Sequence, residues 1–177
     1  MLSYDESLKI LKETSALLEG HFILSSGLHS KHYIQCAKLL SFPKKAESIC
    51  SSLCKKITDN INKVDMILSP AVGGIVIGYE VGRQLGIETI FAERSDGKLN
   101  LRRGFKIPKN FNVLIVEDVI TTGKSAFECS ELVKLSHANI SGYACIIDRS
   151  NKDELVIKDR IVSQVKIKIE TFKNNDL

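Results

Sequence analysis

The sequence predicts an α/β fold, in which a central, mostly parallel sheet is flanked by helices on both faces. Short and nearly continuous apolar runs occur at residues 64–68, 87–92, 113–116 and 140–147. Helical patterns separate several of these runs, and the turns between them contain glycine, proline and small polar residues. Strands that are buried on both faces need such uninterrupted apolar runs, and parallel strands need helical crossovers.

The N-terminal third of the chain predicts two helices with two short strands between them. Apolar residues at helical spacing behind a serine cap predict a helix over residues 3–18. Residues 21–24 and 31–36 predict strands joined by a Ser-Ser-Gly turn. Pro43 suits the first turn of a helix that continues to about Asn60.

The rest of the chain predicts two more helices, a charged arm and an edge strand. The helices are expected over residues 74–85 and 125–135, each after an apolar run. Residues 98–105 are charged and flanked by glycine, which predicts a loop or a hairpin arm. Alternation over residues 161–169 predicts an edge strand with one buried face. No repeat or linker divides the chain, so we expect a single domain over residues 1–177.

Composition excludes some functions. The net charge of +4 suits small anionic ligands, and no dense Lys/Arg run with interleaved aromatics suggests nucleic-acid binding. The five cysteines form no CxxC pair, and Cys50 and Cys54 are expected to be buried on one face of a helix rather than to bind a metal. The N-terminus resembles neither a signal peptide nor a membrane span, so we expect a cytoplasmic protein.

The segment VLIVEDVITTGKS, residues 113–125, carries the predicted chemistry. Its aliphatic half predicts a central strand that ends at Glu117 and Asp118, and a Thr-Thr-Gly-Lys-Ser loop then enters a helix. Ligands of open α/β sheets bind beyond the carboxyl ends of the strands. A loop that enters a helix offers N–H groups and hydroxyls to a phosphate, and carboxylates accept hydrogen bonds from ribose hydroxyls. The segment therefore predicts a sugar-phosphate site.

Simpler interpretations stay open for each part of this segment. Glu117 and Asp118 alone are compatible with an acidic strand end, and the loop alone with a capped turn. A Walker P-loop is excluded, because Asp118 occupies the position where that motif requires its first glycine.

As a whole, residues 113–125 resemble the phosphoribosyl-pyrophosphate signature of type I phosphoribosyltransferases, and the chain is most similar to the short bacterial orotate phosphoribosyltransferases. The resemblance implies the type I fold with a small N-terminal hood, built from about residues 1–40 and the C-terminal strand. Residues 20–33 resemble this hood, which closes over orotate and to which Ser25 belongs. Many relatives carry Lys at the position of Ser25, and a solvent-exposed hairpin is the alternative.

Three further passages support the resemblance. Residues 69–74 (SPAVGG) resemble the pyrophosphate loop, with Gly73 where some relatives have Lys; a tight turn is the alternative. Residues 92–105 resemble the mobile catalytic loop, in which Arg94 and Lys98 match the family's Arg and second Lys. Ser95 and Asn100 stand where relatives carry Lys and His, and a surface charge cluster is the alternative. In residues 146–150 (IIDRS), Arg149 matches an orotate-binding arginine, although a strand-end salt bridge would also explain it.

The resemblance implies transfer of a phosphoribosyl group from phosphoribosyl pyrophosphate to orotate, in the synthesis of pyrimidine nucleotides. It assigns catalytic roles to Glu117, Asp118 and Lys98, and orotate binding to Thr121, Arg149 and Ser25. The residues implied to bind phosphoribosyl pyrophosphate are Ala71, Val72, Gly73, Arg94, Lys98, Glu117, Asp118, Val119, Ile120, Thr121, Thr122, Gly123, Lys124 and Ser125.

The resemblance also implies partners and a cofactor. Mg²⁺ would be carried by the substrate without direct protein ligands, and a homodimer would share its active sites, with neither nucleic acid nor a membrane as partner. A purine-base phosphoribosyltransferase and a non-catalytic regulator that binds phosphoribosyl pyrophosphate remain the alternatives.

Overall fold

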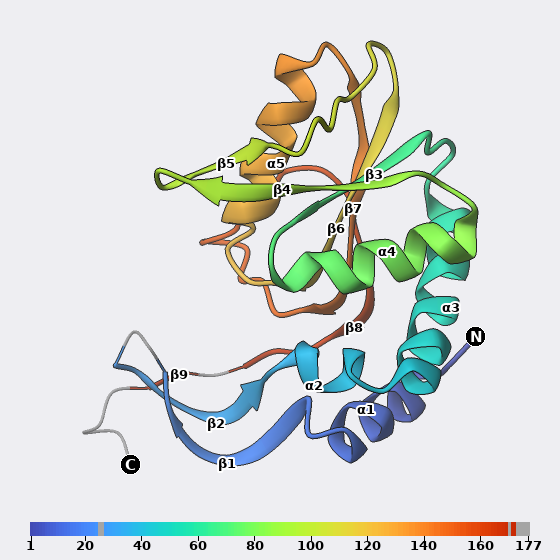
Figure 1. The fold of residues 1–177 in the computed structure, drawn as a ribbon. Coiled ribbons are helices and arrows are strands. Elements are labelled where there is room, and N and C mark those ends of the chain that lie inside the picture. The colour runs from blue at the N-terminus through green and yellow to red at the C-terminus, as the bar shows by residue number, and fades with distance from the viewer. Residues whose placement is uncertain (25–26, 170, 173–177) are drawn as a thin grey trace.

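A six-stranded sheet forms the centre of the computed structural model, which describes residues 1–24, 27–169 and 171–172 (Figure 1). The strand order is β5-β4-β3-β6-β7-β8, and every neighbouring pair is parallel except the β4–β5 hairpin. The mostly parallel sheet that the sequence predicts is therefore confirmed. The strands are β3 (Met66–Pro70), β4 (Thr89–Ser95), β5 (Lys98–Leu101), β6 (Asn112–Ile120), β7 (Asn139–Asp148) and β8 (Ile161–Lys166).

Helices cover both faces of this sheet. One face packs on α3 (Pro43–Asn60) and α4 (Gly73–Leu85), and the other packs on α5 (Lys124–Leu135). Strand β6 takes part in both cores, because Leu114 and Val116 pack with α3 and α4 while Val113 and Ile115 pack with α5. Burial on both sides explains why the sequence of β6 is continuously apolar rather than alternating.

A smaller antiparallel sheet lies beside the main one and has the order β1-β2-β9. Its strands are β1 (Leu17–Ile23), β2 (His29–Ile34) and β9 (Thr171–Phe172). Only four residues separate the end of β8 from the start of β9. A connection this short keeps the small sheet near the carboxyl ends of the parallel strands, as Figure 1 shows.

The helix predicted over residues 3–18 is wrong over its last five residues, 14–18. Helix α1 (Tyr4–Glu13) begins at a capping box on Ser3 but ends at Thr14. Ser15 then adopts a left-handed backbone, with φ of 57°, which no helix can continue. Leu17 is buried and pairs with Ile34 of β2, so strand pairing replaces the helical pattern there.

The remaining helices of the N-terminal part include one that was not predicted and one that has its predicted bounds. A short helix that was not predicted, α2 (Cys36–Leu40), follows β2. Helix α3 has its predicted bounds and begins with Pro43 in its first turn. Cys50 and Cys54 are buried within it, as predicted, and all five cysteines are buried free thiols. No helix within the described ranges has both the length and the apolar character needed to cross a membrane.

Candidate functional site

Strand β6 brings Glu117 and Asp118 to the carboxyl end of the sheet, but on opposite faces of it. Successive side chains of a strand point to opposite faces. Asp118 points to the α4 side, where its carboxylate oxygens lie about 3 Å from the place that a Cβ on Gly73 would occupy. Glu117 points to the α5 side, where its charge adds to the effect of burial in raising the pKa of the Cys129 thiol.

Both carboxyl groups are partly buried, and this changes their acidity. Burial, together with the smaller effect of the neighbouring Asp118 charge, raises the pKa of Glu117 to about 8. Burial also raises the pKa of Asp118, although the N–H of Val119 donates a 2.8 Å hydrogen bond to its Oδ1 and opposes the rise. Among the residues that the structure describes, neither acid forms an ion pair, and donors from a ligand would stabilise their ionised forms.

The loop between β3 and α4 lies directly against Asp118. Ala71 is fixed by its N–H, which donates to the carbonyl of Ala92 at 2.8 Å, and the Ala71–Val72 peptide bond is cis. A side chain on Gly73 would meet the Asp118 carboxylate at 3.0–3.2 Å. The absence of a side chain at Gly73 thus lets this loop lie against the Asp118 carboxylate. Residues 69–74 and 113–125, which the sequence analysis assigned to one site, are therefore neighbours in the fold.

The loop after β6 turns sharply at Gly123 and delivers the first turn of α5. Gly123 has a φ of +75°, and a Cβ there would lie 2.6 Å from Cδ1 of Ile157. The N–H of Val156 donates a 2.9 Å hydrogen bond to the carbonyl of Thr122, which ties the loop to residues 155–157. Thr121 and Thr122 remain exposed, and no acidic residue occupies the first turn of α5. The result is a rigid, open helix N-terminus of the kind that binds phosphate.

Thr121 and Arg149 lie side by side, as their predicted common role requires. Ile120 of β6 pairs with Asp148 of β7, and the N–H of Arg149 donates to the carbonyl of Ile120 at 2.9 Å. Arg149 is half-buried, and its Nε is buried without a hydrogen-bond partner in the described part of the chain. Burial lowers the pKa of this guanidinium. An unpartnered buried donor beside an exposed threonine is suited to an anionic or carbonyl-bearing ligand.

The two cations predicted for the pyrophosphate lie in the β4–β5 hairpin and are less closely tied to this site. Nη1 of Arg94 donates to the carbonyl of Gly97 at 2.7 Å and to Glu128 of α5 at 3.0 Å. Lys98 is exposed and lines a groove of about 480 Å³ that Lys124 also borders. The predicted hairpin arm is confirmed, and it places Lys98 near the loop after β6 but leaves Arg94 bound to Glu128.

One part of the site was not found from the sequence, and one predicted residue is not described. Leu155 and Ile157 pack under Gly123, and Val156 bonds to the loop. The short apolar run at residues 155–157 within a charged stretch was the available signal. Ser25, predicted to contact orotate, lies outside the described residues.

Comparison with known proteins places this geometry in a family. Residues 42–175 match the phosphoribosyl transferase domain family, a match that spans most of the chain. The chain belongs to the phosphoribosyltransferases. A relative from Caldicellulosiruptor bescii, named orotate phosphoribosyltransferase, is 45% identical over 172 residues, which cover 97% of this chain and 89% of the relative. A protein of the same name from Chlorobaculum parvum is 49% identical over 85% of this chain and 77% of its own length.

The solved structures of phosphoribosyltransferases support the fold. The structure of orotate phosphoribosyltransferase from Aeropyrum pernix superposes with a TM-score of 0.75 and covers 90% of this chain and 92% of its own. At 22% sequence identity, this likeness concerns the fold alone. The type I phosphoribosyltransferase fold expected from residues 113–125 is therefore confirmed.

Proposed function

We propose that the protein is an orotate phosphoribosyltransferase, which forms orotidine 5′-phosphate and pyrophosphate from orotate and phosphoribosyl pyrophosphate. The observation that carries the proposal is the pairing of Ile120 with Asp148, which sets the phosphate-binding loop beside the unpartnered Nε of Arg149. A sugar phosphate and a planar base can thus be held by adjacent strand ends. The relatives named orotate phosphoribosyltransferase, at 45% and 49% identity, support the same conclusion.

The substrate groups are assigned to the parts of the site by charge and by donor type. The 5-phosphate would occupy the loop of residues 119–125, where N–H groups, hydroxyls and the end of α5 favour an anion. The ribose hydroxyls would donate to Asp118 and Glu117. The pyrophosphate would lie between residues 71–73, whose loop adjoins Asp118, and the hairpin cations Arg94 and Lys98.

The reaction breaks the bond from the ribose C1 to pyrophosphate and forms a bond from C1 to N1 of orotate. No protein nucleophile is required, and the chain contributes by positioning and by electrostatics. Asp118, ionised when the ribose hydroxyls donate to it, would stabilise positive charge that develops on the sugar. Glu117, with a pKa near 8, would gain or lose a proton close to neutral pH as ligands bind. Arg149 and Thr121 would orient the base, and the small sheet would act as a hood over it.

Mg²⁺ would enter this site together with the substrate. No group of three or more His, Cys, Asp or Glu side chains that could hold a metal ion is found among the described residues. Mg²⁺ tolerates one or two carboxylates with waters and phosphate oxygens as its other ligands. Asp118 adjoins the loop of residues 71–73 that is proposed to hold the pyrophosphate, and the ion would supply neutralisation of the departing pyrophosphate.

The function is tested by measuring pyrophosphate release from phosphoribosyl pyrophosphate with Mg²⁺ present. We expect release when orotate is added and none with hypoxanthine or adenine. Release with a purine base instead would replace the proposal by a purine-base phosphoribosyltransferase. Binding of phosphoribosyl pyrophosphate without release for any base would indicate a non-catalytic role.

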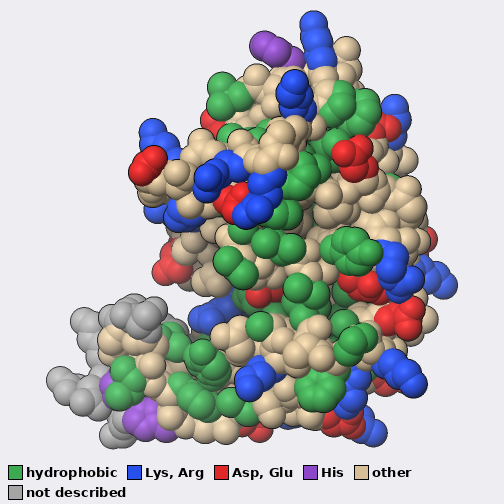
Figure 2. Space-filling view, viewed as in Figure 1, with side chains coloured by type: hydrophobic (Ala, Val, Ile, Leu, Met, Phe, Trp, Pro, Cys, Tyr) green, Lys and Arg blue, Asp and Glu red, His purple; other side chains and the backbone are tan. Residues whose placement is uncertain are grey.

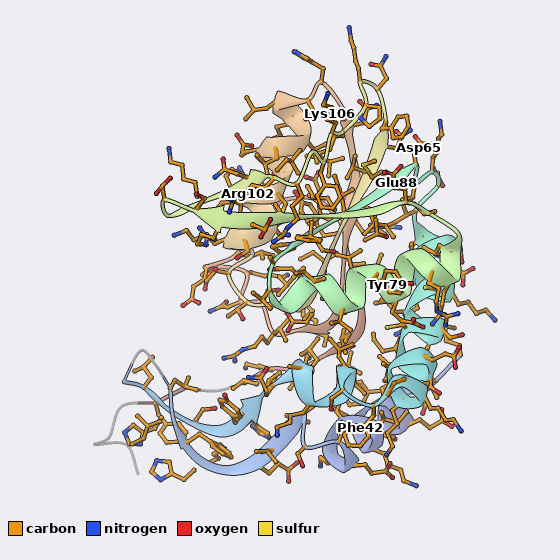
Figure 3. The ribbon with its side chains drawn as sticks, viewed as in Figure 1. Phe42, Asp65, Tyr79, Glu88, Arg102 and Lys106 are labelled. Atoms are coloured by element: carbon orange, nitrogen blue, oxygen red, sulfur yellow. The ribbon has the colours of Figure 1, made fainter. Side chains whose placement is uncertain are left out.

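We further propose a homodimer with shared sites, in which the outer face of α4 forms the contact. Val72, Val76 and Tyr79 are apolar residues at helical spacing with 83%, 51% and 66% exposure. Val72 belongs to the loop beside Asp118, so this exposed face runs into the site. Figure 3 shows Tyr79 on the outer surface of α4, and Figure 2 shows that apolar side chains are exposed on this face of the molecule. Aromatic and aliphatic residues that are exposed together are typical of contacts between subunits.

The dimer has two tests. Tyr79→Glu should halve the mass measured by light scattering, whereas Leu135→Glu, at an exposed apolar residue on α5, should not. In a shared site, Lys98 of one subunit would act together with Arg149 of the other subunit. Mixing inactive Lys98→Ala and Arg149→Ala subunits should then restore activity, because each mixed dimer would contain one site in which both residues are intact. A monomeric wild-type protein, or no recovery in mixed dimers, would contradict this arrangement.

A further inference from the structure

A groove of about 700 Å³ opens beside Arg149, and most of its polar lining is cationic. One wall follows β7 and the other is the segment that leads from β8 towards the small sheet. Figure 2 shows a hollow between the main body and the small sheet, with basic side chains at its opening. The lining residues are Arg149, Ser150, Asn151, Lys152, Lys166, Ile167, Lys168 and Ile169. The sequence-based assignment of the base site included only the first of these.

The charges in this groove do not balance. Lys166 forms a 3.1 Å ion pair with Asp148, whose other oxygen accepts a hydrogen bond from the N–H of Ser150 at 2.8 Å. This carboxylate is therefore satisfied. Among the residues that the structure describes, no ion pair is found for Arg149, Lys152 or Lys168. Three cations around one groove, with the acid already neutralised, leave a positive potential for an anionic ligand.

The segment that carries Lys168 is anchored along the groove. Ile167 is buried in the core, and its N–H donates to the carbonyl of Asp148 at 2.9 Å, which anchors this segment to β7. Ile169 packs against the same core. Lys166 and Lys168 line the groove together with Ile167 and Ile169, and Lys166 forms its ion pair with Asp148 there. Lys168 follows Lys166 by two residues and is closer along the chain to β9, a strand of the small sheet that is proposed to cover the base.

We propose that Lys168, assisted by Lys152, binds the carboxylate of the base and makes the site selective for an anionic pyrimidine over a neutral one. This inference rests on the proposed function and extends it by naming a residue that determines specificity. Arg149 and Thr121 would bind the polar ring edge, which orotate and uracil share, while Lys168 would bind the group that only orotate carries. An ammonium group on a flexible stem suits a single carboxylate at the mouth of a groove.

The experiment compares orotate with uracil in wild-type protein and in Lys168→Gln. We expect KM for orotate to rise about tenfold, which corresponds to about 1.4 kcal/mol. The KM for phosphoribosyl pyrophosphate, the melting temperature and kcat/KM for uracil should stay unchanged. Lys168→Arg should keep most of the affinity for orotate, and Lys152→Gln should show a smaller rise. Lys109→Gln is the matched control, because this exposed lysine lies before β6 at the opposite end of the sheet.

The outcomes separate this inference from the proposed function. A wild-type protein that releases no pyrophosphate with orotate contradicts the function itself. A wild-type protein that uses orotate, together with a Lys168→Gln variant of unchanged orotate KM, overturns only the role of Lys168. Equal losses for orotate and uracil also overturn it, because selectivity would then be unchanged. Calorimetric titration with orotidine 5′-phosphate adds a readout without turnover, in which Lys168→Gln should weaken binding by the same factor.

Discussion

The loop after β6 and the β4–β5 hairpin are proposed to bind opposite ends of one substrate, yet they are held in different ways. The loop after β6 is built into the core, with Gly123 against Ile157 and Thr122 bonded to Val156. The hairpin turns at Asp96 and Gly97, and among the described residues, apart from its two chain neighbours, no atom lies within 4 Å of a Cβ placed on Gly97. Three exposed side-chain bonds of Arg94 and Asn100 go to the hairpin's own backbone, and another joins Arg94 to Glu128 of α5.

This difference indicates different duties. A phosphate cradle is effective when its donors are fixed before the ligand arrives, and the loop after β6 is fixed by buried contacts. Groups that must follow a departing pyrophosphate need mobility, and exposed segments with few buried contacts open at low free energy. We therefore expect substitutions in the first loop to change stability and activity together, and substitutions in the hairpin to change mainly activity.

The largest effect is expected at Gly123. Gly123→Ala would place a side chain in a left-handed conformation and 2.6 Å from Ile157, so we expect a loss of about 2–5 kcal/mol in the free energy of unfolding. Denaturant unfolding would measure it. Gly97→Ala is the matched control, because its φ of +79° gives the same backbone strain without a neighbour. Equal losses in the two variants would contradict the packing argument.

A catalytic effect of similar size is expected at Asp118. Asp118→Asn keeps the shape of the side chain but removes the charge that would stabilise the transition state, so we expect kcat to fall about 100-fold, or roughly 2.7 kcal/mol. The free energy of unfolding should not fall, because burial already disfavours the ionised carboxyl group. Steady-state kinetics and thermal unfolding of the same preparation would check this. A variant with normal kcat would remove Asp118 from the mechanism.

The comparison also shows which features a sequence can predict. Strand β6 and helices α3 and α5 have strong patterns, because each buries a continuous or periodic set of residues in the core. The helix was extended wrongly to residue 18, because Leu17 and Leu18 continue the helical spacing while their strand pairing with β2 depends on distant residues. Likewise, the contact of Gly73 with Asp118 joins segments that no local pattern connects.

The sequence was most informative about the candidate site where the proposed chemistry lies within one segment. Residues 113–125 could be interpreted directly, whereas the role of residues 155–157 depends on their packing under Gly123. Glu117 and Asp118 point in opposite directions because β6 continues to Ile120 and both residues lie within the strand. A strand that ended at residue 116 would have left both acids in a loop, without alternation.

The next effect concerns pH and Glu117. Its pKa is raised from 4.5 to about 8 in the folded chain, so the folded chain keeps a proton that the unfolded chain loses. This contribution to stability is complete below pH 4.5 and is lost as the pH rises to about 8, with a slope of at most about 1.4 kcal/mol per pH unit. Glu117→Gln should flatten the profile of unfolding free energy over this range. Glu131→Gln, on the exposed face of α5, should leave that profile unchanged. A Glu117→Gln variant with the wild-type slope would show that Glu117 is not the group whose pKa is raised.

The smallest effect on stability is expected in the hairpin, at the ion pair of Arg94 with Glu128. Their side chains are 43% and 23% exposed and lie 3.0 Å apart, so Glu128→Gln should remove at most about 1 kcal/mol and less at high salt. Glu93→Gln, which breaks the similarly exposed pair with Arg103, is the matched control. Arg94→Ala should lower the free energy of unfolding equally little, but it should raise the KM for phosphoribosyl pyrophosphate. Glu128→Gln frees Arg94 from its ion pair, so the same KM should stay unchanged or become lower. If Glu128→Gln impairs activity as much as Arg94→Ala, Glu128 is needed to hold Arg94 in place. The hairpin would then present its cation from a fixed position, as the loop after β6 presents its donors, despite its exposure.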